Sequence, residues 1–442
     1  MKINFFGYKY KLQHFFNNIF SFRFLVLISP VFVITIRHWI SLILIIISIG
    51  AFRFLLKSDI KYNLNTSSYK WRLYILLIFI FPFLSVLISQ ILRLEIHFAN
   101  FDAPLRLFLC SIIFTAISNG WLSSKHQEPI SFSLVKYSLP LTIICTFLYR
   151  PSWTGLHGDK VITTYFVDVL TFGSINLLLT LITIFTLTIY YKKISLAIFY
   201  VYCIIIFTGF YLSTASNTRS GWIGLPFILI IWYYFFGIVE LGRIKSLTII
   251  IIIFSICFYY IFNNDILYSK IIIGYYQLVN YNWNSLSDEG SADVRISLFR
   301  MAWFYFINRP ILGWGDLGWL SLINAPELVS FSSFTARMIA INGFHNEILT
   351  NTVRSGIWGL ISSIWFYLIP ILWFIKIYKI SNNIKYISLF QLILTLHLFF
   401  TGLTTEVTNL IFLSSFYGLL MSIFLGESFY FHNKIINNKL DS

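Results

Sequence analysis

Apolar stretches long enough to cross a lipid bilayer recur along almost the whole chain. A bilayer core about 30 Å thick is crossed by about 20 apolar residues in a helix. We count about twelve such stretches, near residues 22–36, 39–56, 73–92, 107–123, 133–149, 170–190, 194–213, 222–240, 246–262, 354–375, 386–402 and 407–426. Only 11% of the 442 residues are charged, whereas about a quarter are charged in soluble domains. The sequence therefore predicts an all-α, polytopic membrane protein with about twelve transmembrane helices.

One long polar segment, residues 263–352, interrupts these stretches. It separates nine spans within residues 1–262 from three spans within residues 353–442. We expect this segment to be partly helical, to lie outside the membrane and to carry the chemistry.

The distribution of charge predicts the orientation of the spans. With twelve spans both termini lie on one side of the membrane, and 20 of the 32 Lys and Arg residues are on that side. Cytoplasmic loops carry an excess of Lys and Arg, so we place both termini in the cytoplasm and segment 263–352 on the outer face. The net charge of +15 is spread along these loops, which argues against a nucleic acid partner. The first span lacks a cleavage site and is expected to be retained.

Sequence signals for a cofactor or a metal are missing. The four cysteines stand apart from one another inside apolar stretches, and the chain has neither a G-x-x-x-x-G-K-[ST] loop nor an Asp-x-Asp pair. Isolated cysteines of this kind are usually small buried hydrophobic residues. We therefore expect no metal, no cofactor and no disulfide framework.

The polar segment contains a predicted helix over residues 294–308. Arg295, Phe299 and Phe306 share one face of it, at spacings of three and four residues. Pro310 ends the helix, and the glycines of Gly313–Gly315 predict a tight turn whose backbone can approach a substrate closely.

Two further polar sequences stand out on the outer face. In GFHNEIL, His345 is predicted to start a helix, and Asn346 or Glu347 is a candidate to orient its imidazole, although Glu347 can instead point to solvent. In STASNTRSGW, residues 213–222, Arg219 stands among six Ser, Thr and Asn residues. Such a polar turn between two spans indicates a pocket at the membrane surface; the alternative is an arginine that reaches lipid headgroups.

The order of these motifs resembles the O-antigen ligase superfamily. The pattern is R-[IL]-x-L-[FW]-x-x-A-[WL] at Arg295–Trp303, R-P-I-L-G-W-G at Arg309–Gly315, H-N-E-I-L at His345–Leu349 and G-I-W-G-L at Gly356–Leu360, preceded by T-R-S-G-W at Thr218–Trp222. The superfamily includes ligases, Wzy-type polymerases and protein O-oligosaccharyltransferases. The layout looks most like the lipopolysaccharide O-antigen ligase.

The resemblance implies an enzyme of the bacterial inner membrane with its active site in the periplasm. Its donor would be a polysaccharide on undecaprenyl pyrophosphate and its acceptor a sugar of lipid A–core. The glycosyl transfer would invert the anomeric centre without a metal.

The candidate residues suit this chemistry. Arg219 and Arg295 are candidates to stabilise the pyrophosphate, because a guanidinium stays charged and binds phosphate oxygens in pairs. His345 is the candidate base for the acceptor hydroxyl. Arg309, Arg337 and Asn346 are candidate substrate contacts.

Each candidate residue also has a plainer interpretation. His345 can be a helix cap or an interfacial histidine, and Arg295 a surface charge. Solvent or lipid headgroups are the plainer partners of four further arginines, Arg300, Arg309, Arg337 and Arg354.

Two other functions stay open. A Wzy-type polymerase uses the same donor with a lipid-linked glycan as acceptor. A flippase for lipid-linked oligosaccharides would need charged residues deep within several spans, and the spans of this chain are nearly free of them.

Overall fold

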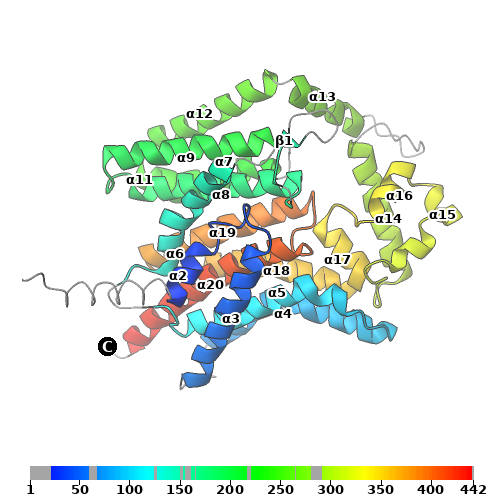
Figure 1. The fold of residues 1–442 in the computed structure, drawn as a ribbon, viewed down its shortest axis with the longest axis horizontal. Helices are drawn as coiled ribbons and strands as arrows, with labels where there is room; N and C mark the ends of the chain where they lie inside the picture. The colour runs from blue at the N-terminus through cyan, green and yellow to red at the C-terminus, as the bar shows by residue number, and fades with distance from the viewer. Residues whose placement is uncertain are drawn as a thin grey trace, which may run out of the picture.

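A computed structural model describes residues 21–58, 67–123, 127–149, 153–154, 161–164, 166–216, 221–263, 265–279 and 291–440. They form a bundle of long helices with a helical segment at one end (Figure 1). Its β-structure in the described part is one antiparallel pair of two-residue strands, β1 (Trp153–Thr154) and β2 (Val161–Ile162). The prediction of an all-α, polytopic protein is confirmed.

Ten helical stretches of the described chain have the length and hydropathy of a membrane span. Five of them are single helices: Trp39–Lys57 (α3), Val169–Tyr190 (α8), Leu196–Ala215 (α9), Ile357–Ile377 (α18) and Asn382–Gly402 (α19). Two are parts of longer helices: Ser68–Arg93 in α4 (Ser67–Arg93) and Ile411–Ile436 in α20 (Ile411–Leu440). Three combine consecutive elements: Phe98–Ser118 (η1, Phe98–Phe101; α5, Asp102–Ser118), Ile130–Tyr149 (α6, Ile130–Ser133; η2, Leu134–Ser138; α7, Leu139–Tyr149) and Trp222–Glu240 (η3, Trp222–Gly224; α10, Leu225–Trp232; η4, Tyr233–Gly237; α11, Ile238–Glu240).

Two of the twelve expected spans are not among these ten. The stretch 22–36 forms only the short helix α2 (Phe22–Ile28) and then a series of turns. Pro30 explains this end, because a proline has no amide hydrogen with which to continue the hydrogen bonds of the helix. The stretch 246–262 is helical within α12 (Arg243–Phe262), but several of its side chains lie outside the described part.

The bundle is held together by close packing and by satisfied polar groups. Along α20, the small residues Gly418, Ser422 and Gly426 repeat every fourth position, and a Cβ atom at Gly418 would lie only 2.8 Å from Cys110 Sγ of α5. Small residues at this spacing let two membrane helices approach closely. In the buried helix α8, Thr183 donates its hydroxyl to the carbonyl oxygen four residues earlier, at 2.7 Å, so that its polar group costs little inside the membrane.

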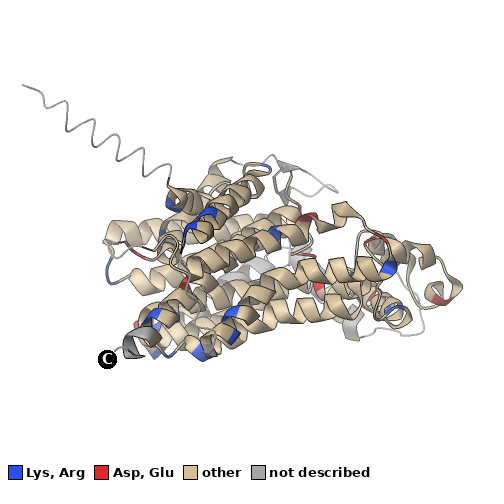
Figure 2. Cartoon of the chain, turned by 90° about the horizontal axis from the view of Figure 1, so that it is seen from below, with Lys and Arg blue, Asp and Glu red and all other residues tan. Residues whose placement is uncertain are grey.

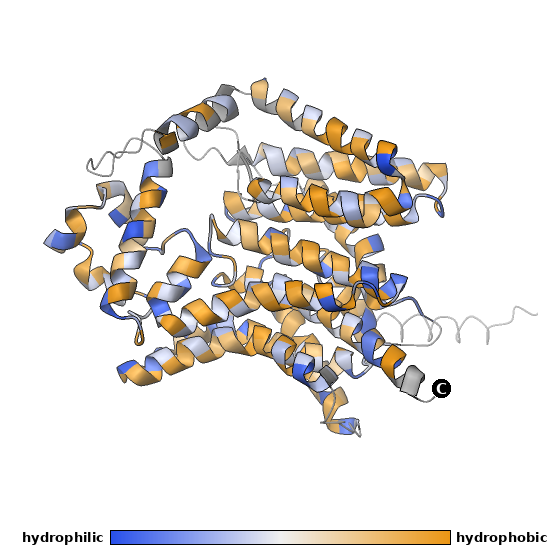
Figure 3. Ribbon diagram, turned by 180° about the vertical axis from the view of Figure 1, so that it is seen from behind, coloured by the Kyte–Doolittle hydropathy of each residue, from blue (hydrophilic) through white to orange (hydrophobic). Residues whose placement is uncertain are grey.

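The two ends of the bundle differ. One end carries α2, α11 and the C-terminal part of α20, and many Lys and Arg residues gather there (Figures 1 and 2). The other end carries α13 (Asp265–Val279), α14 (Ser291–Asn308), η5 (Gly318–Leu322), α15 (Pro326–Val329), α16 (Phe334–Ala340) and α17 (Glu347–Ser355). Apolar residues dominate the long helices, whereas this second end is mixed (Figure 3).

The polar segment has a small core of its own. Leu298, Met301 and Tyr305 of α14 are buried together with Trp314 and Phe344. The helix predicted over 294–308 and its end before Pro310 are both confirmed. Because Phe344 is fixed in this core, the segment positions the residue that follows it, His345.

Candidate functional site

The structure brings Arg295 and His345 to the same place. Arg295 lies on the exposed face of α14, and His345 stands exposed just before α17, against which α14 packs. Partial burial and the positive charge of Arg295 both lower the pKa of His345 below its ordinary value of 6.5. The imidazole is therefore mostly neutral near pH 7, as a general base must be.

His345 has an unusual backbone. Its φ angle is 46°, in the left-handed region that side chains other than glycine rarely adopt. The expected helix begins two residues later, at Glu347, because Asn346 is the N-cap: its side chain accepts a hydrogen bond from the Leu349 amide at 3.1 Å. The prediction that His345 itself starts the helix is therefore wrong by two positions.

The side chains of Asn346 and Glu347 form hydrogen bonds with another loop instead of with the imidazole of His345. The Asn346 amide donates to the Leu403 carbonyl at 3.4 Å. Glu347 is only 1% exposed, and its carboxylate accepts hydrogen bonds from the amides of Val407 and Thr408. The alternative that Glu347 points to solvent is wrong, because three donors of the α19–α20 loop compensate for its burial. A substrate contact of Asn346 stays a prediction.

The arginine turn around Arg219 lies outside the described residues, but both of its ends are visible. On one side Ser216 donates to the Ser213 carbonyl at 2.7 Å. On the other, Gly221 has a φ of 82°, and a Cβ atom there would lie 2.9 Å from the ring of His397. Of the two flanking residues, Ser216 thus belongs to the end of α9 and Gly221 lies against α19.

Arg309 and Arg337 have structural partners. The guanidinium of Arg309 is exposed and lies 4.1 Å from the ring centre of Trp314, a cation–π contact. Arg337 donates to the Ser332 carbonyl at 2.6 Å, just before α16. Their roles as substrate contacts stay predictions.

The glycine turn packs against the protein itself. Gly313 and Gly315 have φ angles of 63° and 76°, which confirms the predicted turn. The amides of Trp314 and Gly315 both donate at 2.9 Å, to the carbonyls of Val353 and Arg354. A Cβ atom at Gly313 would overlap the Arg354 backbone, so this glycine is required by contact with α17 instead of with a substrate.

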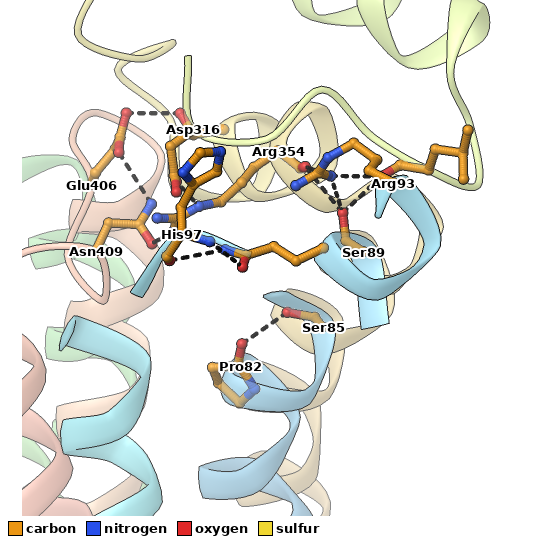
Figure 4. Close-up of polar contacts among 12 residues, drawn as sticks. Pro82, Ser85, Ser89, Arg93, His97, Asp316, Arg354, Glu406 and Asn409 are labelled. Carbon is orange, nitrogen blue, oxygen red and sulfur yellow. Dashed lines mark hydrogen bonds and ion pairs between the residues drawn. The ribbon is translucent and has the colours of Figure 1, made fainter. Parts of the chain in front are cut away.

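A polar network that the sequence did not predict joins α17 to the loop after α19 (Figure 4). Arg354 pairs with Asp316 and donates to Asn409 Oδ1 at 3.1 Å, and Asn409 donates to Glu406 at 3.1 Å. The Arg354 side chain is only 13% exposed, which contradicts the interpretation that it is solvated. Arg93 of α4 extends the network, because it donates to the Leu312 carbonyl at 2.8 Å. The one available sequence signal was Glu406, an acid in the polar run between two spans.

An apolar groove of about 740 Å³ runs along the bundle between α8, α9, α10 and α12. Its lining reaches Lys245 and Tyr191 near one end of the bundle and Thr214 and Trp222 at the other. Thr214 and Trp222 flank the arginine turn. Two of the lining side chains, Phe207 and Ile252, are more than half exposed within the apolar helices, so the groove opens on the surface that faces lipid.

In the described part of the chain, no three His, Cys, Asp or Glu residues lie where they could hold a metal ion together. The cation that the structure places beside His345 is Arg295.

The motif residues lie inside a recognised domain. Residues 204–364 match the Wzy_C family model, described as O-antigen ligase. The matched Wzy_C region begins in α9, ends in α18 and contains the arginine turn, α14 and His345. Such a domain occurs in both O-antigen ligases and Wzy polymerases, so the match indicates transfer of a lipid-linked glycan by one type or the other. None of the curated proteins matches the chain.

Proposed function

We propose that this protein is an O-antigen ligase that transfers a polysaccharide from undecaprenyl pyrophosphate to lipid A–core. The observation that carries the proposal is the imidazole of His345 beside the cation of Arg295, where burial and that cation lower the pKa of the imidazole. A base next to a phosphate-binding cation is what an attack on a glycosyl pyrophosphate requires.

The proposed reaction is one displacement. The acceptor hydroxyl attacks the anomeric carbon from the face opposite the pyrophosphate, and the bond from that carbon to the phosphate oxygen breaks. His345 accepts the hydroxyl proton, a contribution typically worth about 10²–10⁴-fold in rate. The leaving pyrophosphate takes the bonding electrons, and Arg219 and Arg295 stabilise its growing charge, at typically about 3 kcal/mol for a well-placed donor.

The groove supports a donor with a long isoprenoid chain. It is almost wholly apolar, and its end at Thr214 and Trp222 adjoins the arginine turn. A chain lying in the groove would bring its pyrophosphate to Thr214 and Trp222, the residues that flank the arginine turn in the sequence. Arg309, Arg337 and Asn346 remain our candidates for contacts with the sugars.

We further propose that the site faces the periplasm of a bacterial inner membrane and that both termini are cytoplasmic. The Lys and Arg residues at the end of the bundle that carries the C-terminus support this orientation (Figure 2). In this arrangement residues 263–352 form the periplasmic segment between the span groups 1–262 and 353–442.

A variant at the candidate base separates an enzyme from a transporter. We expect His345→Ala to lower glycan transfer by about 10²–10⁴-fold, with donor binding retained, in an assay of the purified protein with lipid-linked polysaccharide and lipid A–core. The matched control is His38→Ala, since His38 is also exposed and also has a positive φ, 62°. Normal transfer by His345→Ala would refute the catalytic role and would favour a flippase.

A gene deletion separates the ligase from the polymerase. In a host with long-chain lipopolysaccharide, loss of a ligase leaves every core without a cap while polymer accumulates on the lipid carrier. Caps of a single repeat unit would instead identify a Wzy polymerase, the alternative that the Wzy_C match leaves open.

A further inference from the structure

Glu347, at the start of α17, is a buried carboxylate that binds a distant loop. Its Oε2 accepts hydrogen bonds from the backbone amides of Val407 at 3.0 Å and Thr408 at 3.1 Å, and its Oε1 accepts one from the Thr408 hydroxyl. All three donors belong to residues 403–410, the loop between α19 and α20, which we call the clamp loop. One side chain therefore fixes the clamp loop against the residue two positions after His345.

Glu406 makes the reciprocal contact from the clamp loop. Its Oε1 accepts a hydrogen bond from the Thr350 hydroxyl at 2.8 Å, and the same hydroxyl accepts the Phe344 amide at 3.0 Å. Gly343 lies so close that a Cβ atom there would overlap the Glu406 carboxylate. Glu406 thus fixes the two residues before His345.

The two carboxylates lie in a common environment with one cation. Burial raises the pKa of both Glu347 and Glu406, and each of the hydrogen bonds above opposes that rise. The Arg354 cation also lowers the pKa of Glu406, and the charge of Glu347 raises it. Arg354 is linked to Glu406 through Asn409, so the pair of carboxylates is joined to the network of Figure 4.

His345 itself needs such support. A non-glycine residue with positive φ is strained, and it persists only where its surroundings determine it. Phe344 is held by its amide and its buried ring, and Asn346 is held as an N-cap that also donates to Leu403 of the clamp loop. The imidazole is the exposed part of a segment that is fixed on both sides.

We propose that Glu347 and Glu406 are positioning residues, which hold His345 in its strained conformation by binding the clamp loop to the start of α17. The effect of this positioning on catalysis rests on the proposed function. Their effect is on the placement of the base, since a base misplaced by about 1 Å loses about 10²-fold in rate.

The test compares three glutamates, of which Glu347 and Glu427 are buried and Glu406 is half-buried. In Glu347→Gln and Glu406→Gln an amide group replaces one of the two acceptor oxygens. The matched control is Glu427→Gln, because Glu427 of α20 is buried like Glu347 and likewise accepts two backbone amides, those of Ile130 and Ser131, at 2.7 and 2.8 Å. Glu427 joins α20 to α6 and has no part in the site.

We expect Glu347→Gln and Glu406→Gln each to lower kcat by about 10- to 100-fold. The KM for the lipid-linked donor should stay unchanged within about twofold. Glu427→Gln should keep both constants near those of the original protein. Should the variants at Glu347 or Glu406 fail to fold, Thr350→Val removes only the hydroxyl between Phe344 and Glu406 and is expected to lower kcat in the same way.

Amide hydrogen exchange supplies a readout that does not depend on activity. Glu406→Gln, Glu347→Gln and Thr350→Val should speed exchange in peptides covering residues 343–350 and 403–410, whereas Glu427→Gln should speed it only near residue 130. Unchanged exchange in both peptides, or a kcat equal to that of Glu427→Gln, would overturn the positioning role. If the unaltered protein transfers no glycan, the proposed function fails instead, and the exchange pattern alone decides whether the clamp exists.

Discussion

At the scale of single residues, the site is defined by how one imidazole is kept neutral. Its pKa is lowered first by partial burial and then by the nearby cation of Arg295. The same arginine that is proposed to bind the pyrophosphate therefore also sets the protonation of the proposed base. This double role makes the pH dependence of the reaction informative.

We expect the acid limb of the kcat/KM profile to have its midpoint below pH 6.5. A base is active when unprotonated, so activity is lost as the pH falls through the lowered pKa of His345. Arg295→Gln removes the cation, which should raise this pKa and move the midpoint of the remaining activity upward. The control is Arg300→Gln on the same helix; its midpoint should not move. A midpoint unaffected by Arg295→Gln would contradict the proximity of the two groups.

At the scale of helices and turns, backbone contacts join the motifs. The turn at Gly313–Gly315 donates two amides to the end of α17, and Gly356, at the start of α18, lies against the Pro310 carbonyl. The arginine, glycine and histidine motifs are thus parts of one packed unit.

A glycine pair tests this packing. Gly313→Ala places a Cβ atom in the Arg354 backbone at a positive φ, and we expect it to lower the free energy of unfolding by about 1–3 kcal/mol. Gly274→Ala, in the middle of α13 with open space around it, should leave stability unchanged or raise it by about 0.5–1 kcal/mol. Thermal unfolding in detergent measures both; equal melting temperatures would show that the turn is not packed as described.

The sequence predicted the helices better than the contacts between them. Hydropathy located the spans because lipid imposes a length and a composition on each helix. It failed at residues 22–36, where Pro30 ends a helix that the apolar pattern alone would continue. It also could not pair Glu347 with Thr408, since nothing in a local pattern links two residues that are 61 positions apart. The motif order predicted Arg295 and His345 as candidate site residues, but the residues that hold the segment around His345 came only from the structure.

At the scale of the whole molecule, the proposed orientation determines which surfaces water-soluble reagents can reach. We expect Ser330→Cys, at the end of α15, to react with a membrane-impermeant maleimide in intact spheroplasts. Lys193→Cys, in the α8–α9 turn, should react only after the membrane is opened. Both positions are exposed, so the difference measures sidedness, and a reversed pattern would place the site in the cytoplasm.

The groove between α9 and α12 opens on the side of the bundle, where Phe207 and Ile252 face lipid. A lipid-linked donor that enters there diffuses within the plane of the bilayer and never crosses open water. The concentration that the protein meets is then the mole fraction of the donor in the bilayer. The rate of transfer in reconstituted vesicles should therefore depend on the ratio of donor to lipid and should not depend on the volume of the sample.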